Sequence, residues 1–369
     1  MIRIGLITWY GSKNYGTNLQ VFALQKAVTN LGYSCDLILP FHFNAFGKKD
    51  FLKRVLSLTG IMKLVLWLRA KRDIKRRKIL KFIWNDLSTR GVYCRAQYRK
   101  LLNDYSVFMT GSDQIWNPYH VKGFYFLDFA GMNKRVAYAS SIGVTELPEE
   151  KKSLYKTELS KFSSIGVREE SARKLLVDLL GRNDVQQVLD PTFLLTPDEW
   201  KTFASSADVE IELPDEYILC YLIGNRENYS RQLQDVRQKT GIKHTIIIQS
   251  AENADFSIAN AICYDCAGPK EFVCLLQSAK LVCTDSFHAT AISINMSIDF
   301  VEFLRFDDND VKSQNSRIYD LLGHYQLSDR FYAADGSKWA EPIDFTQSQS
   351  ILERDRENSI HFLVNAIEN

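Results

Sequence analysis

The chain opens with Ile2-Arg3-Ile4-Gly5-Leu6-Ile7-Thr8, which predicts a buried strand, and the residues that follow it decide the fold class. A loop of small and polar residues, 11–18, leads into a helix predicted from about Leu19 to Leu31. Gly32 is suited to end that helix, and Cys35 to Leu39 predicts the next strand. A strand, a helix and a second strand in this order indicate an open parallel sheet.

The same alternation continues along the chain and predicts an α/β protein of two domains. The segment around Asp190-Pro191-Thr192 and Thr196-Pro197 is the expected crossover, so we predict Rossmann-like domains at residues 1–195 and 196–369 that face a cleft. The last predicted helix, about 351–367, is a candidate to pack back on the first domain. Further strands are predicted at 106–109, 136–139, 165–167, 217–222, 245–248, 281–283 and 298–303, and further helices at 172–180, 229–240 and 269–279.

The composition is that of a globular protein: 46% of the 369 residues are apolar and 24% are charged, which excludes disordered, collagen-like and disulfide-scaffold proteins. The seven cysteines are scattered and odd in number, so we expect reduced thiols. Cys263 and Cys266 have CxxC spacing, but no second pair completes a zinc site, and we expect them to be structural. No secretory signal is visible, and apolar stretches such as 64–68 are far shorter than the roughly 20 residues that span a bilayer, so we expect a cytoplasmic protein.

Positive charge is concentrated in one segment. Residues 48–81 contain 13 Lys or Arg and two acids, which leaves 33 bases and 42 acids in the rest of the chain. We predict a basic amphipathic insertion, 48–85, for which two interpretations stay open. It either packs on the first domain with a solvated basic face, or makes a peripheral contact with an anionic membrane or a lipid pyrophosphate. No nucleic-acid-binding motif accompanies it, so we expect no nucleic-acid partner.

Two strand-to-helix turns carry dense hydrogen-bonding groups, at the kind of position where open α/β sheets bind ligands. A plain tight loop explains the first turn equally well, and in the second Asp113 could either act on a hydroxyl or cap the turn. The candidate contacts to an acceptor are Asn14, Tyr15, Gly16 and Asn18 in the first turn, and Gly111, Ser112, Asp113 and Gln114 in the second.

Two further turns carry groups suited to an anion. Arg168 follows the strand 165–167, where its planar guanidinium could bind a carboxylate or phosphate, or pair with a neighbouring glutamate. His288 follows Asp285 and Ser286, both good helix caps, so it is expected in the first turn of a helix. A proton donor and an anion could meet there, although a lone histidine is often structural.

Taken together, these segments resemble the polysaccharide pyruvyl transferase family from about residue 4 to about residue 325. The most specific pieces are Gly111-Ser112-Asp113-Gln114-Ile115-Trp116-Asn117 and Thr284-Asp285-Ser286-Phe287-His288. The other pieces, in order, are Asn14-Tyr15-Gly16-Thr17-Asn18-Leu19-Gln20, Val167-Arg168-Glu169, Asp190-Pro191-Thr192 and Gly268-Pro269-Lys270-Glu271-Phe272.

The resemblance implies a fold similar to the GT-B glycosyltransferases and transfer of a pyruvyl group from phosphoenolpyruvate to two hydroxyls of one sugar, giving a cyclic ketal. It implies that His288 is catalytic and that Arg168 binds phosphoenolpyruvate. From the chemistry we further expect Ser286 and His288 to contact phosphoenolpyruvate and Asp113 to act on the acceptor. Many members carry arginine where this chain has Ser286, so another cation is expected at phosphoenolpyruvate. The candidates are Arg305, Lys312 and Arg317, with Arg317 preferred.

The expected setting is the synthesis of a bacterial capsule, exopolysaccharide or other cell-envelope glycan, with a sugar or a lipid-linked oligosaccharide as acceptor. The transfer needs no cofactor and no metal, because the pyruvyl group moves without oxidation. Two alternatives stay open from the sequence. One is a GT-B glycosyltransferase that uses a sugar nucleotide, and the other is a non-catalytic carbohydrate-binding scaffold at the membrane.

Overall fold

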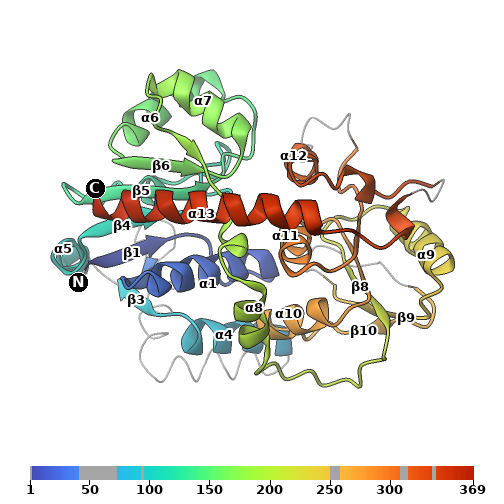
Figure 1. Ribbon diagram of the computed structural model, residues 1–369. Coiled ribbons are helices and arrows are strands. Elements are labelled where there is room, and N and C mark those ends of the chain that lie inside the picture. Colours follow the sequence, from blue (N-terminus) through green and yellow to red (C-terminus); the bar gives the residue numbers. More distant parts are fainter. Residues whose placement is uncertain (1, 41–72, 93–94, 250–257, 308–314, 335–337) are drawn as a thin grey trace. The chain divides into compact units, whose positions relative to one another are not determined.

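The computed structural model describes residues 2–40, 73–92, 95–249, 258–307, 315–334 and 338–369 (Figure 1). The chain forms two compact units. Unit 1 comprises Met1–Gly11, Gln20–Leu194 and Asn358–Asn369, and unit 2 comprises Ser12–Leu19 and Leu195–Glu357. The sequence-based boundaries assigned residues 12–19 to the N-terminal domain, so their packing with unit 2 is a correction.

Unit 1 is built on a parallel sheet that, within the described residues, has seven strands in the order β3-β2-β1-β4-β5-β6-β7. The strands are β1 (Arg3–Ile7), β2 (Ser34–Pro40), β3 (Thr89–Val92), β4 (Val107–Thr110), β5 (Lys134–Ser140), β6 (Ser164–Val167) and β7 (Gln186–Gln187). The helices are α1 (Tyr15–Asn30), α4 (Ile74–Asn85), α5 (Arg95–Asp104), α6 (Glu149–Leu159) and α7 (Glu170–Leu180), with short 3₁₀ turns at η2 (Gly123–Phe126) and η3 (Pro191–Phe193).

Unit 2 repeats this design on a smaller scale. Its sheet, over the residues that the structure describes, has five parallel strands in the order β10-β9-β8-β11-β12. The strands are β8 (Tyr217–Tyr221), β9 (His244–Ile247), β10 (Ile262–Cys263), β11 (Leu281–Thr284) and β12 (Phe300–Glu302). The helices are α8 (Pro197–Ala204), α9 (Tyr229–Thr240), α10 (Pro269–Gln277), α11 (Phe287–Met296), α12 (Ser316–His324) and α13 (Thr346–Glu368), with 3₁₀ turns at η4 (Ser328–Arg330) and η5 (Lys338–Ala340).

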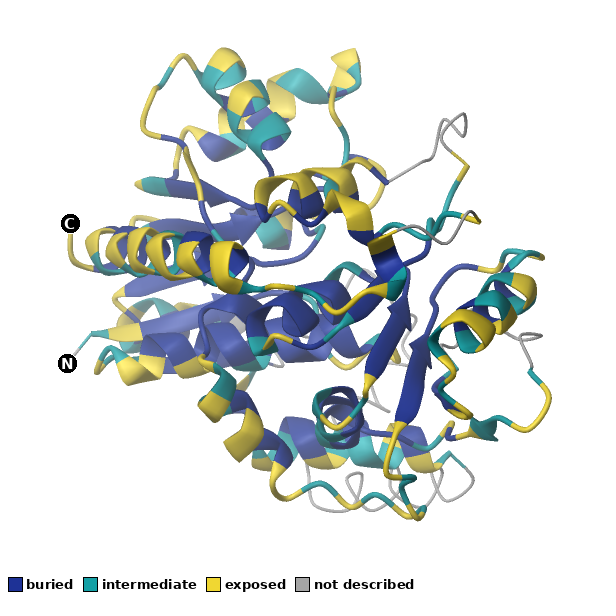
Figure 2. Cartoon of the chain, turned by 45° about the vertical axis from the view of Figure 1, so that its right-hand side comes forward, coloured by how far each residue is buried: buried dark blue, intermediate teal, exposed yellow. Residues whose placement is uncertain are grey.

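The central strands are apolar on both faces because helices cover both faces of a parallel sheet. Every residue of β4, β8 and β11 is buried. Helix α9 instead buries only one stripe, Tyr229, Leu233 and Val236, at the spacing of an amphipathic helix. Figure 2 shows this contrast between buried strands and helices with exposed outer faces.

Helix α1 begins at Tyr15, four residues before the predicted start at Leu19. Asn14 caps it, because its Oδ1 accepts a hydrogen bond of 2.9 Å from the backbone N–H of Gly16. Of the small and polar residues 11–18 that suggested a loop, residues 15–18 therefore form the first turn of the helix. Sequence periodicity missed this turn because its burial comes from packing with unit 2, which no local pattern records.

The end of α13 packs within unit 1. Ser359 Oγ accepts a hydrogen bond of 3.0 Å from Leu189 N, and Lys134 Nζ donates one of 3.1 Å to the carbonyl of Ile367. The ring of Phe362 lies so close to Gly166 that a Cβ added there would be 2.7 Å from it. Residues 358–369 thus pack on unit 1 at a position where β6 carries glycine, because a larger side chain there would collide with Phe362.

Most of the predicted basic insertion lies outside the described residues, which include only positions 73–85 of it. In that part, α4 buries Ile79, Phe82 and Ile83 and exposes Arg76 and Lys81. This agrees with a helix that packs on unit 1 and presents a solvated basic side. None of the described helices combines the length and the apolar character needed to cross a bilayer.

Candidate active site

Both sheets have a topological switch point, where the strand order reverses and ligands bind beyond the carboxyl ends of the strands. In unit 1 it lies between β1 and β4, and in unit 2 between β8 and β11. The two most specific sequence pieces, Gly111–Asn117 and Thr284–His288, follow β4 and β11 directly. The chemistry-bearing residues are therefore at the expected edges of both sheets.

In unit 2, Asp285 ties the end of β11 to the loop after β8. Its carboxylate accepts hydrogen bonds from Ile223 N (2.6 Å), Gly224 N (2.7 Å) and the hydroxyl of Tyr229 (2.8 Å). Burial raises the pKa of this carboxyl, while the three donors and the nearby charge of Arg305 act in the opposite direction. Asp285 therefore fixes the backbone from which α11 starts.

The next residue, Ser286, is the N-cap of α11, yet its side chain does not cap the helix. Its hydroxyl is 1% exposed and has no hydrogen-bond partner among the described residues. The first N–H groups of any α-helix have no intrahelical partner, and they point along the positive end of the helix dipole. The start of α11 thus combines such N–H groups with a buried hydroxyl that no described residue binds.

His288 lies in the first turn of α11 and is 7% exposed. Its imidazole packs directly on Gly16, where an added Cβ would be 2.1 Å from Nδ1. Only glycine fits at position 16, because real Cβ atoms do not come within 3.0 Å of another heavy atom. Gly16 and His288, which are 272 positions apart in the sequence, are thus in contact within unit 2.

The other predicted acceptor contacts of the first turn have structural roles. The Tyr15 ring stacks on Phe272 at 4.6 Å, and its hydroxyl donates a 2.9 Å hydrogen bond to the carbonyl of Ala267. Tyr15 is fully buried, so its side chain packs within unit 2, and its contact with an acceptor stays a prediction. Asn18 Nδ2 binds the carbonyls of Ser12 (2.8 Å) and Asn14 (3.0 Å) and thereby holds the loop before α1.

Of the three candidate cations, Arg305 lies beside Gly224 and acts on Asp285, the residue that precedes the N-cap of α11. Its Cγ is 2.9 Å from the position of a Cβ added at Gly224, and its charge acts on Asp285. Arg317 is the second residue of α12 and is half-buried. Lys312 lies outside the described residues.

In unit 1, the turn after β4 is shaped by its own backbone. A Cβ at Gly111 would lie 1.9 Å from the carbonyl oxygen of Tyr138, at a φ of +120°, so this position requires glycine. Asp113 has a φ of 68°, and its Oδ1 accepts a 2.8 Å hydrogen bond from Gln114 N. Both glycine and aspartate are thus needed to form this turn, whatever else Asp113 does. Gln114 is half-buried against Gly143.

Arg168 is the centre of a buried ion-pair network. Its Nε donates to Glu169 (3.0 Å) and its Nη1 to Asp190 (3.1 Å), and its side chain is 3% exposed. Burial alone lowers the pKa of the guanidinium, but the charges of Glu169, Asp190 and Asp113 outweigh burial and raise it. The hydroxyl of Ser112 also donates to Asp190 (3.1 Å), which links the ends of β4 and β6. Arg168 is therefore ionised and already matched by two carboxylates.

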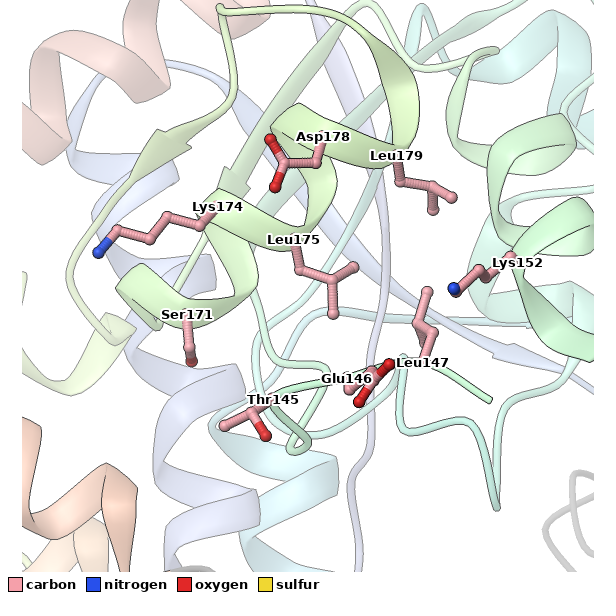
Figure 3. A pocket seen from close by; sticks show the side chains of 9 residues that line it. All are labelled: Thr145, Glu146, Leu147, Lys152, Ser171, Lys174, Leu175, Asp178 and Leu179. Carbon is pink, nitrogen blue, oxygen red and sulfur yellow. The ribbon is translucent and has the colours of Figure 1, made fainter. Parts of the chain in front are cut away.

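A separate cavity of about 540 Å³ lies between α6 and α7, and Figure 3 shows its lining. Three leucines line it together with polar and charged side chains, and none of the residues predicted from the sequence to bind a substrate is among them. The lining residues are Thr145, Glu146, Leu147, Lys152, Ser171, Lys174, Leu175, Asp178 and Leu179.

Comparison with known proteins identifies the arrangement. The family model described as polysaccharide pyruvyl transferase matches residues 14–305, which include both switch-point turns, Arg168 and His288. The chain belongs to the polysaccharide pyruvyl transferase family. A comparison with curated proteins gave no significant match.

Solved structures show which known folds resemble that of this polysaccharide pyruvyl transferase family member. UDP-GlcNAc 2-epimerase from Neisseria meningitidis, bound to UDP-GlcNAc, aligns over 99% of this chain and 100% of its own, at 10% identity and a TM-score of 0.50. UGT89C1 from Arabidopsis thaliana, complexed with quercetin, covers 99% of both chains at 9% identity and a TM-score of 0.47. The epimerase alignment and the two parallel sheets confirm the predicted α/β, GT-B-like fold class.

Sequence reasoning missed two residues that complete the α11 turn of this pyruvyl transferase family member. Gly16 was assigned to an acceptor rather than to His288, and no local signal could have linked them. Glu302 was overlooked, although an acid within the apolar run 298–303 is a visible signal. It is fully enclosed in unit 2 and hydrogen-bonded to Thr290 of α11.

Proposed function

We propose that this protein transfers a pyruvyl group from phosphoenolpyruvate to two hydroxyls of one sugar in a cell-surface polysaccharide or its lipid-linked precursor. The products are a cyclic ketal and inorganic phosphate. The observation that carries the proposal is the α11 turn, where His288, held against Gly16, stands beside the buried hydroxyl of Ser286 and the N–H groups of the helix start.

The donor site in this proposal lies in unit 2. Phosphoenolpyruvate carries close to three negative charges, so it needs cations as well as N–H donors. Ser286, the start of α11 and Arg305 would supply them, with Lys312 and Arg317 as further candidates. Arg168 stays a predicted contact from unit 1, but its two carboxylate partners leave it no net positive charge to offer.

The chemistry balances without an oxidant or reductant. Protonation of the C3 methylene gives C2 oxocarbenium character, and the first sugar hydroxyl adds there. Phosphate then leaves, the second hydroxyl closes the ring, and the protons of the two hydroxyls account for the new methyl C–H and for the phosphate. We propose His288 as the general acid or base, and Asp113 as the group that positions or deprotonates the acceptor. No cofactor takes part in these steps.

The test replaces His288 with alanine and measures acceptor-dependent phosphate release from phosphoenolpyruvate with a panel of p-nitrophenyl hexosides, together with the mass of the product. We expect His288→Ala to lower turnover about 10²- to 10⁴-fold while the protein stays folded. His244→Ala is the matched control, because His244 is exposed on β9 of the same unit, and it should keep wild-type turnover. A folded His288→Ala variant with wild-type turnover would remove His288 from the mechanism.

Thermal unfolding of the wild type with each candidate donor distinguishes a pyruvyl transferase from a glycosyltransferase. Stabilisation against heat by a sugar nucleotide, with no effect of phosphoenolpyruvate, would indicate a glycosyltransferase.

We also propose a cytoplasmic location with peripheral membrane contact through residues 48–81. Sedimentation with vesicles of anionic lipid, compared with neutral vesicles, tests this contact.

A further inference from the structure

Glu302 is a carboxyl group that the proposed chemistry does not use. It ends β12, pairs in register with Thr284 at the end of β11, and is 1% exposed. Its Oε2 lies 2.5 Å from the hydroxyl oxygen of Thr290, and its Oε1 has no hydrogen-bond partner among the described residues. An acid in such a place is either strongly compensated or neutral.

The hydrogen bonds of Thr290 indicate where the protons are. Its hydroxyl oxygen is 3.0 Å from the carbonyl oxygen of Ser286 and 2.5 Å from Glu302 Oε2. A hydroxyl has one proton, and a carbonyl oxygen can only accept. Each contact has a proton of its own when Thr290 donates to Ser286 and Glu302 donates to Thr290, whereas an ionised Glu302 would leave Thr290 to share one proton between two acceptors. That arrangement requires a proton on Glu302.

The charges around Glu302 favour the same state. The titratable group whose charge acts on it is Asp285, at the end of the neighbouring strand, and this like charge disfavours a second carboxylate. Arg305, the nearby cation, acts on Asp285, which also has three hydrogen-bond donors. Burial raises the pKa of Glu302 well above its usual range and outweighs the lowering effect of a hydrogen bond donated by Thr290, and Asp285 raises the pKa further.

We propose that Glu302 is a neutral carboxylic acid in the folded protein and that, through Thr290, it fixes the first turn of α11 from which His288 projects. Glu302 is thus a positioning residue. Because Glu302 donates its proton to the Thr290 hydroxyl oxygen, the hydroxyl's own proton points to the carbonyl of Ser286, the N-cap of the turn that carries His288. When that proton is lost, Thr290 must turn its own proton to the carboxylate, and the bond to Ser286 is broken. The consequence for catalysis rests on the proposed function, whereas the protonation state does not.

The first experiment measures the protonation state without any substrate. Unfolding by urea is followed at pH 5, 6, 7 and 8 for wild type and Glu302→Gln, whose amide can donate to Thr290 but cannot ionise. Because the unfolded glutamate ionises near pH 4.3 and the folded one does not, the wild-type protein loses stability relative to the variant as the pH rises. We expect the folding constant of Glu302→Gln divided by that of the wild type to rise about tenfold per pH unit.

Glu357→Gln is the control, since Glu357 is exposed on α13, and its ratio to wild type should stay constant. A constant ratio for Glu302→Gln as well would mean that Glu302 is ionised when folded, and would overturn the proposal. If Glu302→Gln does not fold, the infrared spectrum of the wild type decides. A protonated-carboxyl carbonyl band that is weaker in folded Glu302→Asp at pH 8 supports the proposal, and the absence of any such band in the wild type refutes it.

The second experiment tests positioning by a pair of variants at Thr290. Thr290→Ser keeps the hydroxyl and should keep kcat for phosphate release within about threefold, whereas Thr290→Val keeps the shape and should lower kcat at least about tenfold with little change in KM for phosphoenolpyruvate. Equal kcat values for the two variants would show that the chain from Glu302 does not position His288. Failure of phosphoenolpyruvate turnover in the wild type would instead refute the proposed function and leave the urea result intact.

Discussion

The contact between Gly16 and His288 makes a sharp prediction for Gly16→Ala. The added Cβ would lie 2.1 Å from His288 Nδ1, and an ordinary contact begins at 3.4 Å, so the imidazole or the α1 turn must move by about 1.3 Å. A misplacement of about 1 Å at a reacting group can cost about 10²-fold in rate. We therefore expect Gly16→Ala to lower kcat by about 10²-fold.

Stability should change much less than activity. Alanine gains up to about 1 kcal/mol over glycine in helix propensity, whereas overpacking costs about 1–3 kcal/mol, so we expect a net loss of about 0–2 kcal/mol. Urea unfolding measures this value, and phosphate release at saturating phosphoenolpyruvate measures kcat. The separation of the two effects is the signature of a misplaced side chain rather than of a misfolded protein.

Gly323→Ala is the matched control because Gly323 is also helical but has room. Its added Cβ meets nothing closer than the Ser328 hydroxyl oxygen at 4.0 Å. This variant should gain about 0.5–1 kcal/mol and keep wild-type kcat. If Gly16→Ala turned over substrate as fast as the wild type, the packing of His288 on α1 would have no bearing on the reaction, and our reasoning about this turn would be refuted.

Three further variants test the scaffold. Arg168→Leu leaves Asp190 and Glu169 buried without their cation and should cost about 3–5 kcal/mol in urea unfolding at pH 7; an unchanged midpoint would exclude a role of the network in stability. Asp36→Asn tests a carboxyl whose pKa is lowered, because hydrogen bonds from Ser88, Tyr105 and Arg3 outweigh the opposing effect of burial. Its stability deficit should be fully present at pH 7 and should shrink as the pH falls below about 4, and a deficit as large at pH 3 as at pH 7 would contradict this assignment. Glu271→Ala removes the acceptor for Gly268 N (2.9 Å) and Asp208 N (3.0 Å) at the start of α10, and should cost about 1–2 kcal/mol in the same assay, whereas Glu271→Gln should lose less.

The sheets were predictable because parallel strands record their burial in a local pattern. Runs such as 106–109, which is apolar after Ser106, and 281–283, which is apolar throughout, correspond to β4 and β11 within one residue. Short edge strands carry no such pattern. β7 has two exposed glutamines, and β3 is mostly exposed, so the sequence did not single them out.

The candidate site was predictable where a motif coincides with a strand end, and not where it depends on long-range packing. His288 follows β11, so its place in a helical first turn could be deduced from the caps before it. The packing of Gly16 on His288, and the hydrogen bond between Thr290 and Glu302, join residues from different elements. Such contacts depend on which segments the tertiary fold brings together, and no periodicity or spacing reports that.

The helix α13 has a consequence for how the chain folds during synthesis. Gly166 on β6 and Leu189 are synthesised well before the groups that cover and bind them, Phe362 and Ser359. The sheet of unit 1 therefore keeps this apolar surface exposed until residues 358–369 have been synthesised. Removal of residues 358–369 would leave that apolar surface exposed permanently, and aggregation of the truncated chains is the expected result.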